Sequence, residues 1–335
     1  MNLYFLNFID HWLIKERERV EMEKALVLGA SGGMGYAIVE ELIEREIEVI
    51  AFARSKEKLE KLFKNKEKVQ IVTGDVFNER DLIKAAEGID IIFHAINIPY
   101  SEWNEKQPTL MRNVVQAAES ANSKLAIVDN IYAYGRGTGR KINEQYPKNP
   151  HTKKGKIRVE LCNIAFQANV PVLIAHFPDF YGPNAANAML TYTFDKMVQN
   201  KKAKFVGNKQ NAREYIYTPD GAKAIVELAI HEKAYGQSWN IPAAGVISGE
   251  KIISIAGSHL HYPKSVSTVT KGMIRFLGIF DKQMREVVEM LYLTEDPVVL
   301  DGSKYEKEIG TLPATPYEEG IKRTLDFMKS NPSNN

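Results

Sequence analysis

The chain of 335 residues has one cysteine, Cys162, so it can form no disulfide bond within itself. This scarcity suits a reducing compartment, and we expect a cytoplasmic protein. No apolar run approaches the roughly 20 residues that a transmembrane helix needs. Lysine and arginine total 44 against 42 acidic residues, a formal net charge of +2. This near balance gives no reason to expect nucleic acid or a membrane as a partner.

A metal-ligand pattern, an internal repeat and a low-complexity linker are also missing. The seven histidines are scattered, and His259 and His261 form a pair too isolated to indicate a metal site. The remaining composition, 44% hydrophobic and 26% charged, is ordinary for a globular protein. The length allows one large α/β unit or two modest domains.

Residues 1–21 form an N-terminal extension of unusual composition. Residues 3–14 are apolar but interrupted by Asp10 and His11, and residues 15–23 are a charge run. A secretory signal peptide would place its basic residues first and end in small residues, which this segment does not do. Two interpretations remain: an amphipathic extension, or translation that truly begins at Met22. The second is favoured because Met22 immediately precedes the first predicted strand.

A strand, a tight turn and a helix are predicted over residues 25–43. The apolar run 25–28 is followed by Gly29, Gly32 and Gly35, and then by helical spacing. In such a turn the first glycine permits the bend, the second lets backbone N–H groups approach a pyrophosphate, and the third lets the helix pack on the strand. The helix N-terminus adds partial positive charge. The residues expected to contact a dinucleotide here are Gly29, Ser31, Gly32, Gly33, Met34 and Gly35.

The second predicted strand, 48–53, ends at Arg54, where folds of this kind meet the adenosine ribose. An acidic residue would favour NAD by accepting hydrogen bonds from the free 2′-hydroxyl. A guanidinium can instead bind a 2′-phosphate through two hydrogen bonds. We therefore expect NADP(H) to be favoured over NAD(H); the alternative is that Arg54 only begins a solvated basic helix.

Strands and helices alternate through the first half of the chain, which predicts an α/β fold with a Rossmann-like doubly wound parallel sheet. After the strand 69–73, Asp75 can bond the adenine amino group or cap the next helix. The strand 89–94 ends in His94, expected to be a satisfied structural residue. Further cofactor contacts are expected at the strand ends from Asp75, Val76, Ala95, Ile96 and Asn97.

A smaller, mainly helical substrate domain is predicted at the C-terminal side. The expected boundaries are 22–183 plus 216–243 for the nucleotide-binding domain, and 184–215 plus 244–330 for the substrate domain. Two apolar sets at helical spacing, within 273–280 and 284–291, are interpreted as core.

With these elements in place, the chain resembles an extended short-chain dehydrogenase/reductase of the NAD(P)-dependent epimerase/dehydratase type over about residues 24–328. The motifs that carry the resemblance are the three glycines, Tyr134-Gly135, Tyr181-Gly182-Pro183, and Arg213-Glu214-Tyr215-Ile216 with Asp220. The resemblance implies NAD(P) binding, with Pro178 as a further cofactor contact. It also implies a homodimer in which the helices over 105–121 and 152–168 pair.

The catalytic motif departs from the family pattern. With Glu160 setting the register, the family's Ser/Thr, Tyr and Lys correspond to Asn130, Thr152 and Lys156. The resemblance implies that Lys156 holds the nicotinamide ribose and that Asn130 bonds a carbonyl oxygen. Thr152 is an aliphatic alcohol and far too weak an acid to replace a phenol. His176 stands where the family usually has an arginine.

A substitute proton donor is therefore needed for catalysis. Tyr132 is the first candidate, because some family dehydratases carry an active-site acid in this stretch. Tyr181 is the second, and Tyr134 is expected to pack structurally. The expected function is an NADP(H)-dependent oxidoreductase acting on a small carbonyl or enone-like substrate. The alternatives are a non-catalytic NADP(H) sensor that regulates a partner, and a sugar-nucleotide epimerase/dehydratase.

Overall fold

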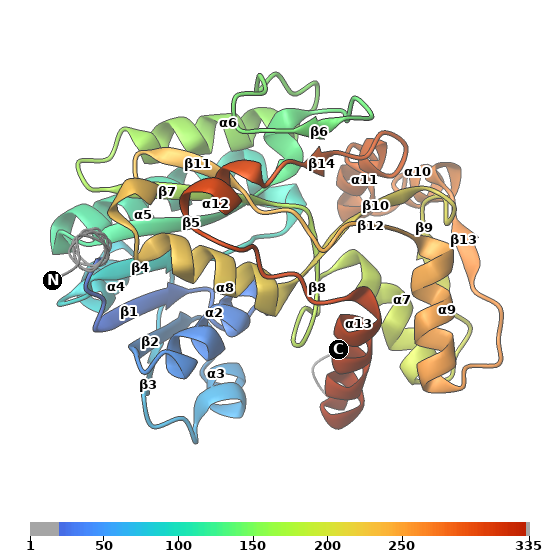
Figure 1. The fold of residues 1–335 in the computed structure, drawn as a ribbon, viewed down its shortest axis with the longest axis horizontal. Helices are drawn as coiled ribbons and strands as arrows, with labels where there is room; N and C mark the ends of the chain where they lie inside the picture. Colours follow the sequence, from blue (N-terminus) through green and yellow to red (C-terminus); the bar gives the residue numbers. More distant parts are fainter. Residues whose placement is uncertain (1–19, 333–335) are drawn as a thin grey trace, which may run out of the picture.

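The computed structural model describes residues 20–332, apart from the side chains of Lys282 and Gln283. Most of the predicted N-terminal extension lies outside the described residues. The centre of the fold is a parallel sheet with strand order β11-β7-β5-β4-β1-β2-β3 (Figure 1). Its strands are β1 (Lys24–Leu28), β2 (Glu48–Ala53), β3 (Val69–Thr73), β4 (Ile91–His94), β5 (Lys124–Asn130), β7 (Val172–Phe177) and β11 (Gln237–Asn240).

Helices cover both faces of this sheet, so its central strands are near-continuous apolar runs. One face packs against α2 (Gly33–Glu44) and α8 (Thr218–Ala229), and α3 (Lys56–Phe63) lies beside β2 and β3. The other face packs against α4 (Glu79–Ala86), α5 (Trp103–Ala121) and α6 (Lys153–Phe166). The α/β, doubly wound parallel fold predicted from the alternation is confirmed.

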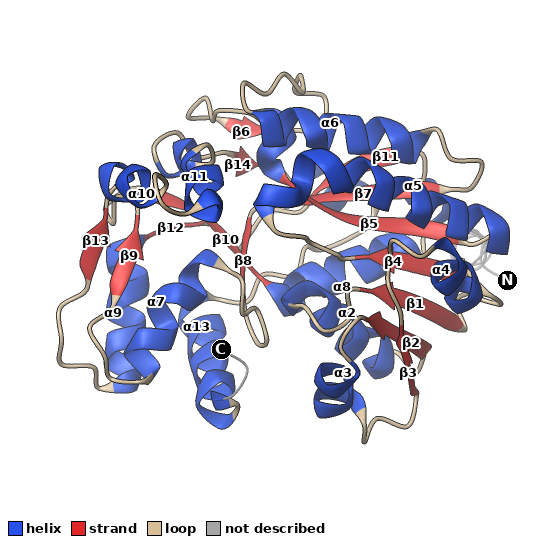
Figure 2. Cartoon of the chain, turned by 180° about the vertical axis from the view of Figure 1, so that it is seen from behind, coloured by secondary structure: helices blue, strands red, loops and turns tan. Residues whose placement is uncertain are grey.

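The second half of the chain builds a smaller lobe beside the carboxyl ends of the strands (Figure 2). Its helices and strands form a third apolar core with Tyr181, Phe194 and Tyr215 at its centre. The elements are β8 (Asp179–Tyr181), α7 (Met189–Val198), β9 (Lys204–Val206), β10 (Ala212–Tyr217), β12 (Val246–Ser248), α9 (Gly249–Leu260), β13 (Ser267–Val269), α10 (Lys271–Leu277), α11 (Lys282–Val288) and α13 (Tyr317–Ser330). The domain boundaries given above stay a prediction.

Short elements connect the two lobes. The chain returns from β10 through α8 to β11, which pairs with β7 in the main sheet. The pair β6 (Lys141–Ile142) and β14 (Val299–Leu300) ties the loop after β5 to the C-terminal region, and α12 (Ser303–Glu308) packs near β11. The 3-10 turn η2 (Ile131–Tyr134) follows β5 directly, and the 3-10 turn η1 (Tyr100–Glu102) lies between β4 and α5. No helix within residues 20–332 is long and apolar enough to cross a bilayer.

The apolar set within 273–280 is not core, and this prediction was wrong. Ile274 is buried, but Phe276, Ile279 and Phe280 are 63%, 67% and 80% exposed. Helical spacing shows which residues share a face of a helix, but it does not show whether another element covers that face. In the second set, within 284–291, Met290 and Leu291 are buried as predicted.

Candidate active site

The predicted glycine turn joins β1 to α2 at the carboxyl edge of the sheet. Gly29 has a φ of +86°, a conformation that side chains rarely adopt, and a Cβ there would lie 2.9 Å from the carbonyl oxygen of Ala95. A Cβ on Gly35 would overlap the backbone of Gly29, and one on Gly33 would meet Ala185. The turn therefore brings β1, β4 and the segment before α7 into close approach.

The N-terminus of α2 is open to an anion. Gly32 caps the helix without a side chain, and the first turn of α2 contains no acidic residue. Ser31 is half-buried, and its carbonyl oxygen accepts a hydrogen bond from the Asn184 amide at 3.2 Å. Free N–H groups and the helix dipole together suit a phosphate group at this end.

At the expected adenosine end, Arg54 is exposed directly after β2, and Ser55 caps α3 by accepting from the Lys58 N–H at 3.3 Å. Asp75 is exposed and accepts from the Phe77 N–H at 3.0 Å. Asp75 does not cap α4, because Asn78 occupies that position. Of the two roles predicted for Asp75, the capping role was wrong, and the adenine contact stays a prediction.

Other predicted cofactor contacts lie along the same edge. Ala95 and Ile96 are half-buried after β4, and Asn97 is exposed. The Val76 side chain is buried in the core, so only its backbone faces the edge. Pro178 is buried after β7.

His94, at the end of β4, is buried but not fully satisfied. Its Nδ1 has no hydrogen-bond partner. Burial, reinforced by the Arg158 charge, lowers the pKa of His94 to about 4, so the ring is neutral at pH 7. The prediction that His94 is a structural residue with all its hydrogen bonds made is therefore wrong for Nδ1.

Two of the three residues at the family's catalytic positions act as local caps. The Asn130 Oδ1 accepts from the Tyr132 N–H at 3.0 Å. The Thr152 Oγ1 accepts from the Gly155 N–H at 3.0 Å and caps α6, with the side chain buried. Lys156 is exposed. Its predicted role of holding the ribose stays a prediction.

The face of α6 that points inward instead carries Lys154, Arg158 and Cys162, which are all buried. The Lys154 Nζ lies 2.5 Å from a Glu286 carboxylate oxygen and 3.0 Å from one of Glu289. Residues 154, 158 and 162 are each four apart, the spacing of one helix face. That spacing is a sequence signal for the buried face, and the sequence analysis did not use it.

Tyr132, the first candidate proton donor, is buried and paired with a second phenol that the sequence analysis missed. The Tyr132 and Tyr100 hydroxyl oxygens lie 2.6 Å apart. Burial raises the pKa of Tyr100 to about 12 and the pKa of Tyr132 well above its ordinary value. Both phenols are therefore protonated at neutral pH. The Lys154 Nζ lies 5.3 Å from the centre of the Tyr100 ring.

The other two tyrosines considered in the sequence analysis, Tyr181 and Tyr134, are packed in the interior. Tyr181, the second candidate donor, is 1% exposed and packs between Tyr217 and Tyr317 in the core of the smaller lobe. Tyr134 donates a hydrogen bond to the Asn240 Oδ1 at 2.7 Å, which agrees with its expected packing role.

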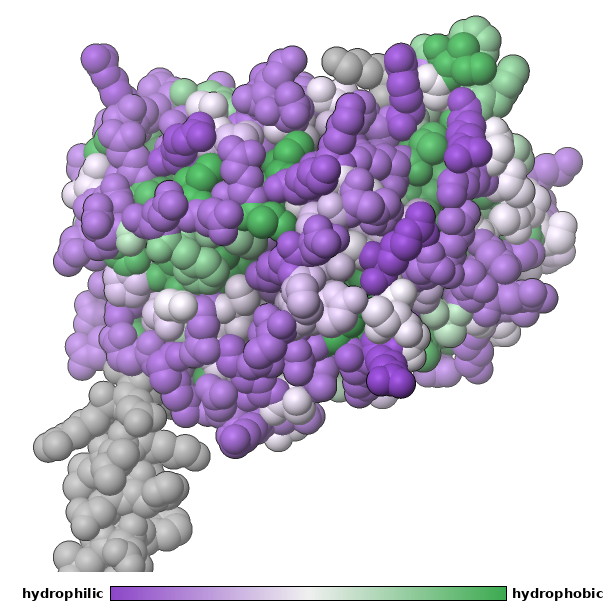
Figure 3. All heavy atoms as spheres, turned by 90° about the horizontal axis from the view of Figure 1, so that it is seen from above, coloured by the Kyte–Doolittle hydropathy of each residue, from purple (hydrophilic) through white to green (hydrophobic). Residues whose placement is uncertain are grey.

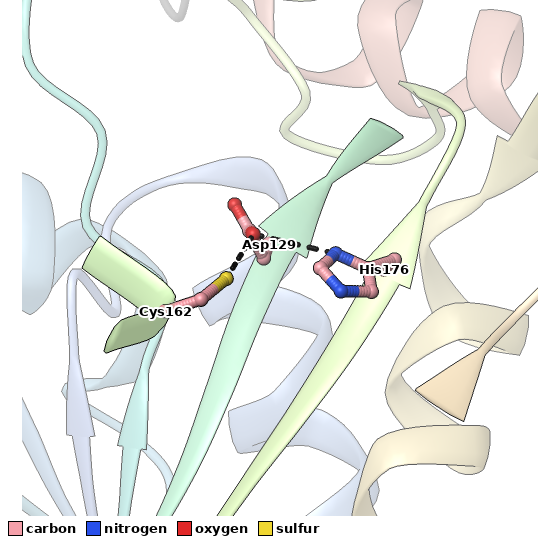
Figure 4. A group of neighbouring side chains, drawn as sticks. All are labelled: Asp129, Cys162 and His176. Atoms are coloured by element: carbon pink, nitrogen blue, oxygen red, sulfur yellow. Dashed lines mark hydrogen bonds and ion pairs between the residues drawn. The ribbon is translucent and has the colours of Figure 1, made fainter. Parts of the chain in front are cut away.

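Beneath the phenol pair lies a buried charged network. An Arg158 nitrogen is 3.2 Å from the Asp129 Oδ1, and the arginine plane stacks on Trp103 with 4.3 Å between their centres. The pair is a charge contact rather than an aligned hydrogen bond, because the Asp129 Oδ1 has no hydrogen-bond partner. The other Asp129 oxygen lies 3.3 Å from the His176 Nδ1 and 3.6 Å from the Cys162 sulfur (Figure 4).

Asp129, Cys162 and His176 could in principle hold a metal ion, since their ligand atoms lie within 4.8 Å of one another. Their surroundings do not suit one. Arg158 contacts Asp129, and the Lys148 Nζ lies 2.8 Å from the His176 Nε2. Burial raises the pKa of the Cys162 thiol to about 12, whereas a metal binds the thiolate. Two cations and a neutral thiol make this a structural network rather than a divalent site.

The motif from Arg213 to Asp220 makes two sets of buried contacts. Arg213 is buried, pairs with Asp179 and stacks on Tyr215 at 4.6 Å. Asp220 accepts from the Thr315 N–H at 2.6 Å and from its hydroxyl at 2.8 Å. Arg213 thus ties β10 to β8 within the smaller lobe, and Asp220 anchors the C-terminal chain at Thr315 against α8.

Comparison with known proteins agrees with this architecture. A protein of Sinorhizobium fredii called y4nL is 25% identical over 79% of this chain and 82% of its own length. A Bacillus subtilis protein named as an uncharacterised UDP-glucose epimerase, YtcB, is 27% identical over 69% of this chain and 80% of its own length. The solved dTDP-glucose 4,6-dehydratase DesIV of Streptomyces venezuelae, with NAD and TYD bound, superposes with a TM-score of 0.76. That match has 19% identity and covers 92% of this chain and 97% of DesIV.

The model of one protein family matches residues 25–241, from β1 through β11. This span contains the glycine turn, both 3-10 turns with their phenols, and α6. The resemblance stated from the motifs is therefore confirmed, and the chain belongs to the NAD dependent epimerase/dehydratase family.

Proposed function

We propose that this chain binds a nicotinamide dinucleotide along the carboxyl ends of the sheet strands and reduces a keto group on a nucleotide-linked sugar. The observation that carries the proposal is the turn at Gly29, which closes against Ala95 and leaves the α2 N-terminus open to phosphate. Dinucleotides bind parallel sheets at the point where strand order reverses, here between β1 and β4.

The form of the cofactor depends on Arg54. Its exposed guanidinium follows β2, where the adenosine ribose lies in such folds, and it supports NADP(H). The solved relative DesIV carries NAD, which supports the other form. We propose NADP(H), because this chain places a cation where NAD-specific sites place a carboxylate.

The substrate class is proposed from the relatives. YtcB is named for UDP-glucose, and DesIV was solved with TYD. This supports a sugar nucleotide over the unspecified small carbonyl or enone expected from the sequence. The smaller lobe, whose strand β8 follows β7 of the main sheet in the chain, supplies the second wall of the proposed site.

The phenol pair favours reduction. Oxidation of an alcohol needs a base, but Tyr100 and Tyr132 are both protonated at pH 7. The Thr152 hydroxyl oxygen already accepts the hydrogen bond that caps α6. In reduction, a bound nicotinamide cofactor would supply the hydride that the carbonyl carbon accepts. The carbonyl oxygen takes a proton from the phenol pair, which recovers one from water. Hydrogen bonds to the developing oxyanion stabilise the transition state.

A second function is supported by the same residues. Because Thr152 is a cap and Lys156 is exposed, the standard catalytic positions hold no phenol and no inward lysine. A dinucleotide sensor needs the glycine turn but not the proton donor. A two-way epimerase is less favoured, because it must move a proton both to and from the substrate oxygen.

The deciding experiment combines binding with turnover. Purified protein is mixed with NADPH or NADH and a panel of UDP- and dTDP-linked keto sugars, and the loss of reduced-nicotinamide absorbance is followed. Turnover with a keto sugar nucleotide supports the reductase. Tight cofactor binding with no turnover across the panel supports the sensor, and failure to bind either cofactor contradicts both.

A further inference from the structure

The surface between α10 and α11 carries a group of large apolar side chains that no other described part of the chain covers. They are Met273, Phe276, Leu277, Ile279 and Phe280, which together are called the apolar ridge below, and all are exposed. A projecting apolar area is visible at the upper right of Figure 3, over the α10 end of the molecule. Contiguous exposed apolar surface of this kind marks an interaction site.

The ridge is held in place from behind. Ile274, on the opposite side of α10, is buried with Val269 and Leu291 in a small separate core. The Phe276 and Phe280 rings contact each other edge to face at 5.8 Å. The buried side of α10 therefore holds the apolar ridge in a fixed position on the surface.

The ridge is flanked by positive charge. Residues 271–285 contain four basic residues and one acidic residue, a local net charge of +3, although the whole chain carries only +2. Lys271 is neutralised by Glu295 at 2.9 Å. Arg275 and Arg285 make no ion pair with any described residue, and they line a surface hollow of about 430 Å³ with Gly278, Ile279 and Val288.

We propose that the apolar ridge docks the protein reversibly on an anionic lipid surface. Phe276, Ile279 and Phe280 would enter the headgroup boundary, and Arg275 and Arg285 would bind lipid phosphates. This combination of apolar and aromatic side chains with adjoining cations is that of an interfacial membrane anchor. A lipid surface fits a projecting ridge because it needs no complementary groove, and its negative charge matches the two unpaired arginines.

The docking element also reaches the candidate active site. On the side away from the ridge, Glu286 of α11 contacts Lys154, and Glu289 just beyond it does the same. Docking would therefore bring the lipid surface to the helix that contacts α6 at Lys154. This inference does not depend on the proposed reductase activity.

The test is sedimentation of the full-length protein with lipid vesicles. Vesicles of phosphatidylcholine alone are compared with vesicles that also contain phosphatidylserine, at low and at high salt. The protein should bind the anionic vesicles, and binding should weaken with salt. Phe276→Ser with Ile279→Ser and Phe280→Ser should abolish binding. Arg275→Ala with Arg285→Ala should weaken it roughly tenfold or more.

Two controls keep the test decisive. Val246→Ser removes an exposed apolar side chain elsewhere and should leave vesicle binding unchanged. All variants alter exposed side chains and should keep the melting temperature of the parent. The proposal is overturned if anionic vesicles do not bind the parent, or if the ridge variants bind as well as Val246→Ser. It is also overturned if the parent is a dimer that the ridge variants convert to monomers, since the ridge would then join two copies.

Discussion

The hydroxyl oxygens of Tyr100 and Tyr132 lie 2.6 Å apart, although the two residues follow different strands of the sheet. Tyr100 comes after β4 and Tyr132 after β5, and parallel neighbouring strands bring these two ends together. The phenol pair therefore stands at the edge where family members bind their ligands. We propose this pair as the proton donor in place of the family tyrosine.

Replacing Tyr132 with Phe removes one hydroxyl and keeps the stacking on Trp103, whose ring centre is 6.1 Å away. We expect kcat for keto-sugar reduction to fall roughly a hundredfold, the usual loss when a general acid is removed. Tyr100→Phe should cause a similar loss, with little change in melting temperature for either variant. Tyr192→Phe, at an exposed position, is the matched control. Full activity in both phenol variants would exclude the pair from proton transfer.

The pH dependence of turnover provides a separate check on the phenol pair. Because the pKa of Tyr100 is raised to about 12, the pair keeps its protons throughout the neutral range. The reduction rate should stay level there and fall only in strongly alkaline solution. A fall centred near neutral pH would show that another group supplies the proton.

Arg54→Ala tests the cofactor preference. If the guanidinium binds the 2′-phosphate, the Kd for NADPH should rise roughly tenfold or more, while the Kd for NADH should hardly change. Isothermal titration of both cofactors measures this. Lys58→Ala, on the exposed face of α3, serves as the control for general loss of positive charge. An unchanged ratio of the two affinities would refute the NADP(H) proposal.

Lys154 and Lys156 form a matched pair on one helix, with Lys154 buried and Lys156 exposed. Lys156→Ala should change cofactor affinity less than about twofold, as expected for a solvated surface charge. Lys154→Ala removes the partner of Glu286 and Glu289 and should loosen α11. Faster tryptic cleavage after Arg285 would report this loosening. A large loss of cofactor affinity in Lys156→Ala alone would restore that residue to its predicted role.

Asp129 should contribute to stability in a pH-dependent manner. Burial raises its pKa, but Arg158 and His176 outweigh burial, and the net pKa falls from 3.8 to about 2. A lowered folded-state pKa stabilises the protein above pH 3.8, and that contribution is lost as the pH falls toward 2. Its size is on the order of 2 kcal/mol.

Asp129→Asn should therefore lower the free energy of unfolding at pH 7 by about 3 kcal/mol, because Arg158 would remain buried without its anion. The variant should also lose part of the acid sensitivity of the parent. Urea unfolding at several pH values measures both effects. Asp326→Asn, which breaks the exposed pair with His259, should cost less than about 1 kcal/mol. Equal losses in the two variants would contradict the buried-network interpretation.

The main sheet could be predicted because its strands are continuous apolar runs separated by clear turns. The bounds predicted for β2 and β3 match the structure, and the glycine turn stands where its spacing indicated. Family motifs at Tyr134, Gly182 and Arg213 also fell at ordered, buried positions. Local sequence carries this information because strand burial on both faces leaves little choice of register.

The inner face of α6 could not be fixed in the same way. Glu160, which set the register of the family motif, lies on the exposed face and does not indicate which residues of α6 point inward. Tyr100 gave no signal at all, because its partner is 32 residues away and the contact depends on strand order. The apolar ridge was interpreted as core because a helix's apolar face looks the same in sequence whether it is covered or exposed.

Equilibrium binding of NADPH and NADH to the purified chain, compared with a Gly33→Val variant, tests the central claim most directly. Gly33 is the first residue of α2, and a side chain there would collide with Ala185. The variant should therefore open the glycine turn and lose cofactor binding. The account predicts saturable binding of at least one cofactor by the parent, and loss of that binding in a variant that remains folded by circular dichroism. Absence of binding by the folded parent, or equal binding by the variant, would contradict it.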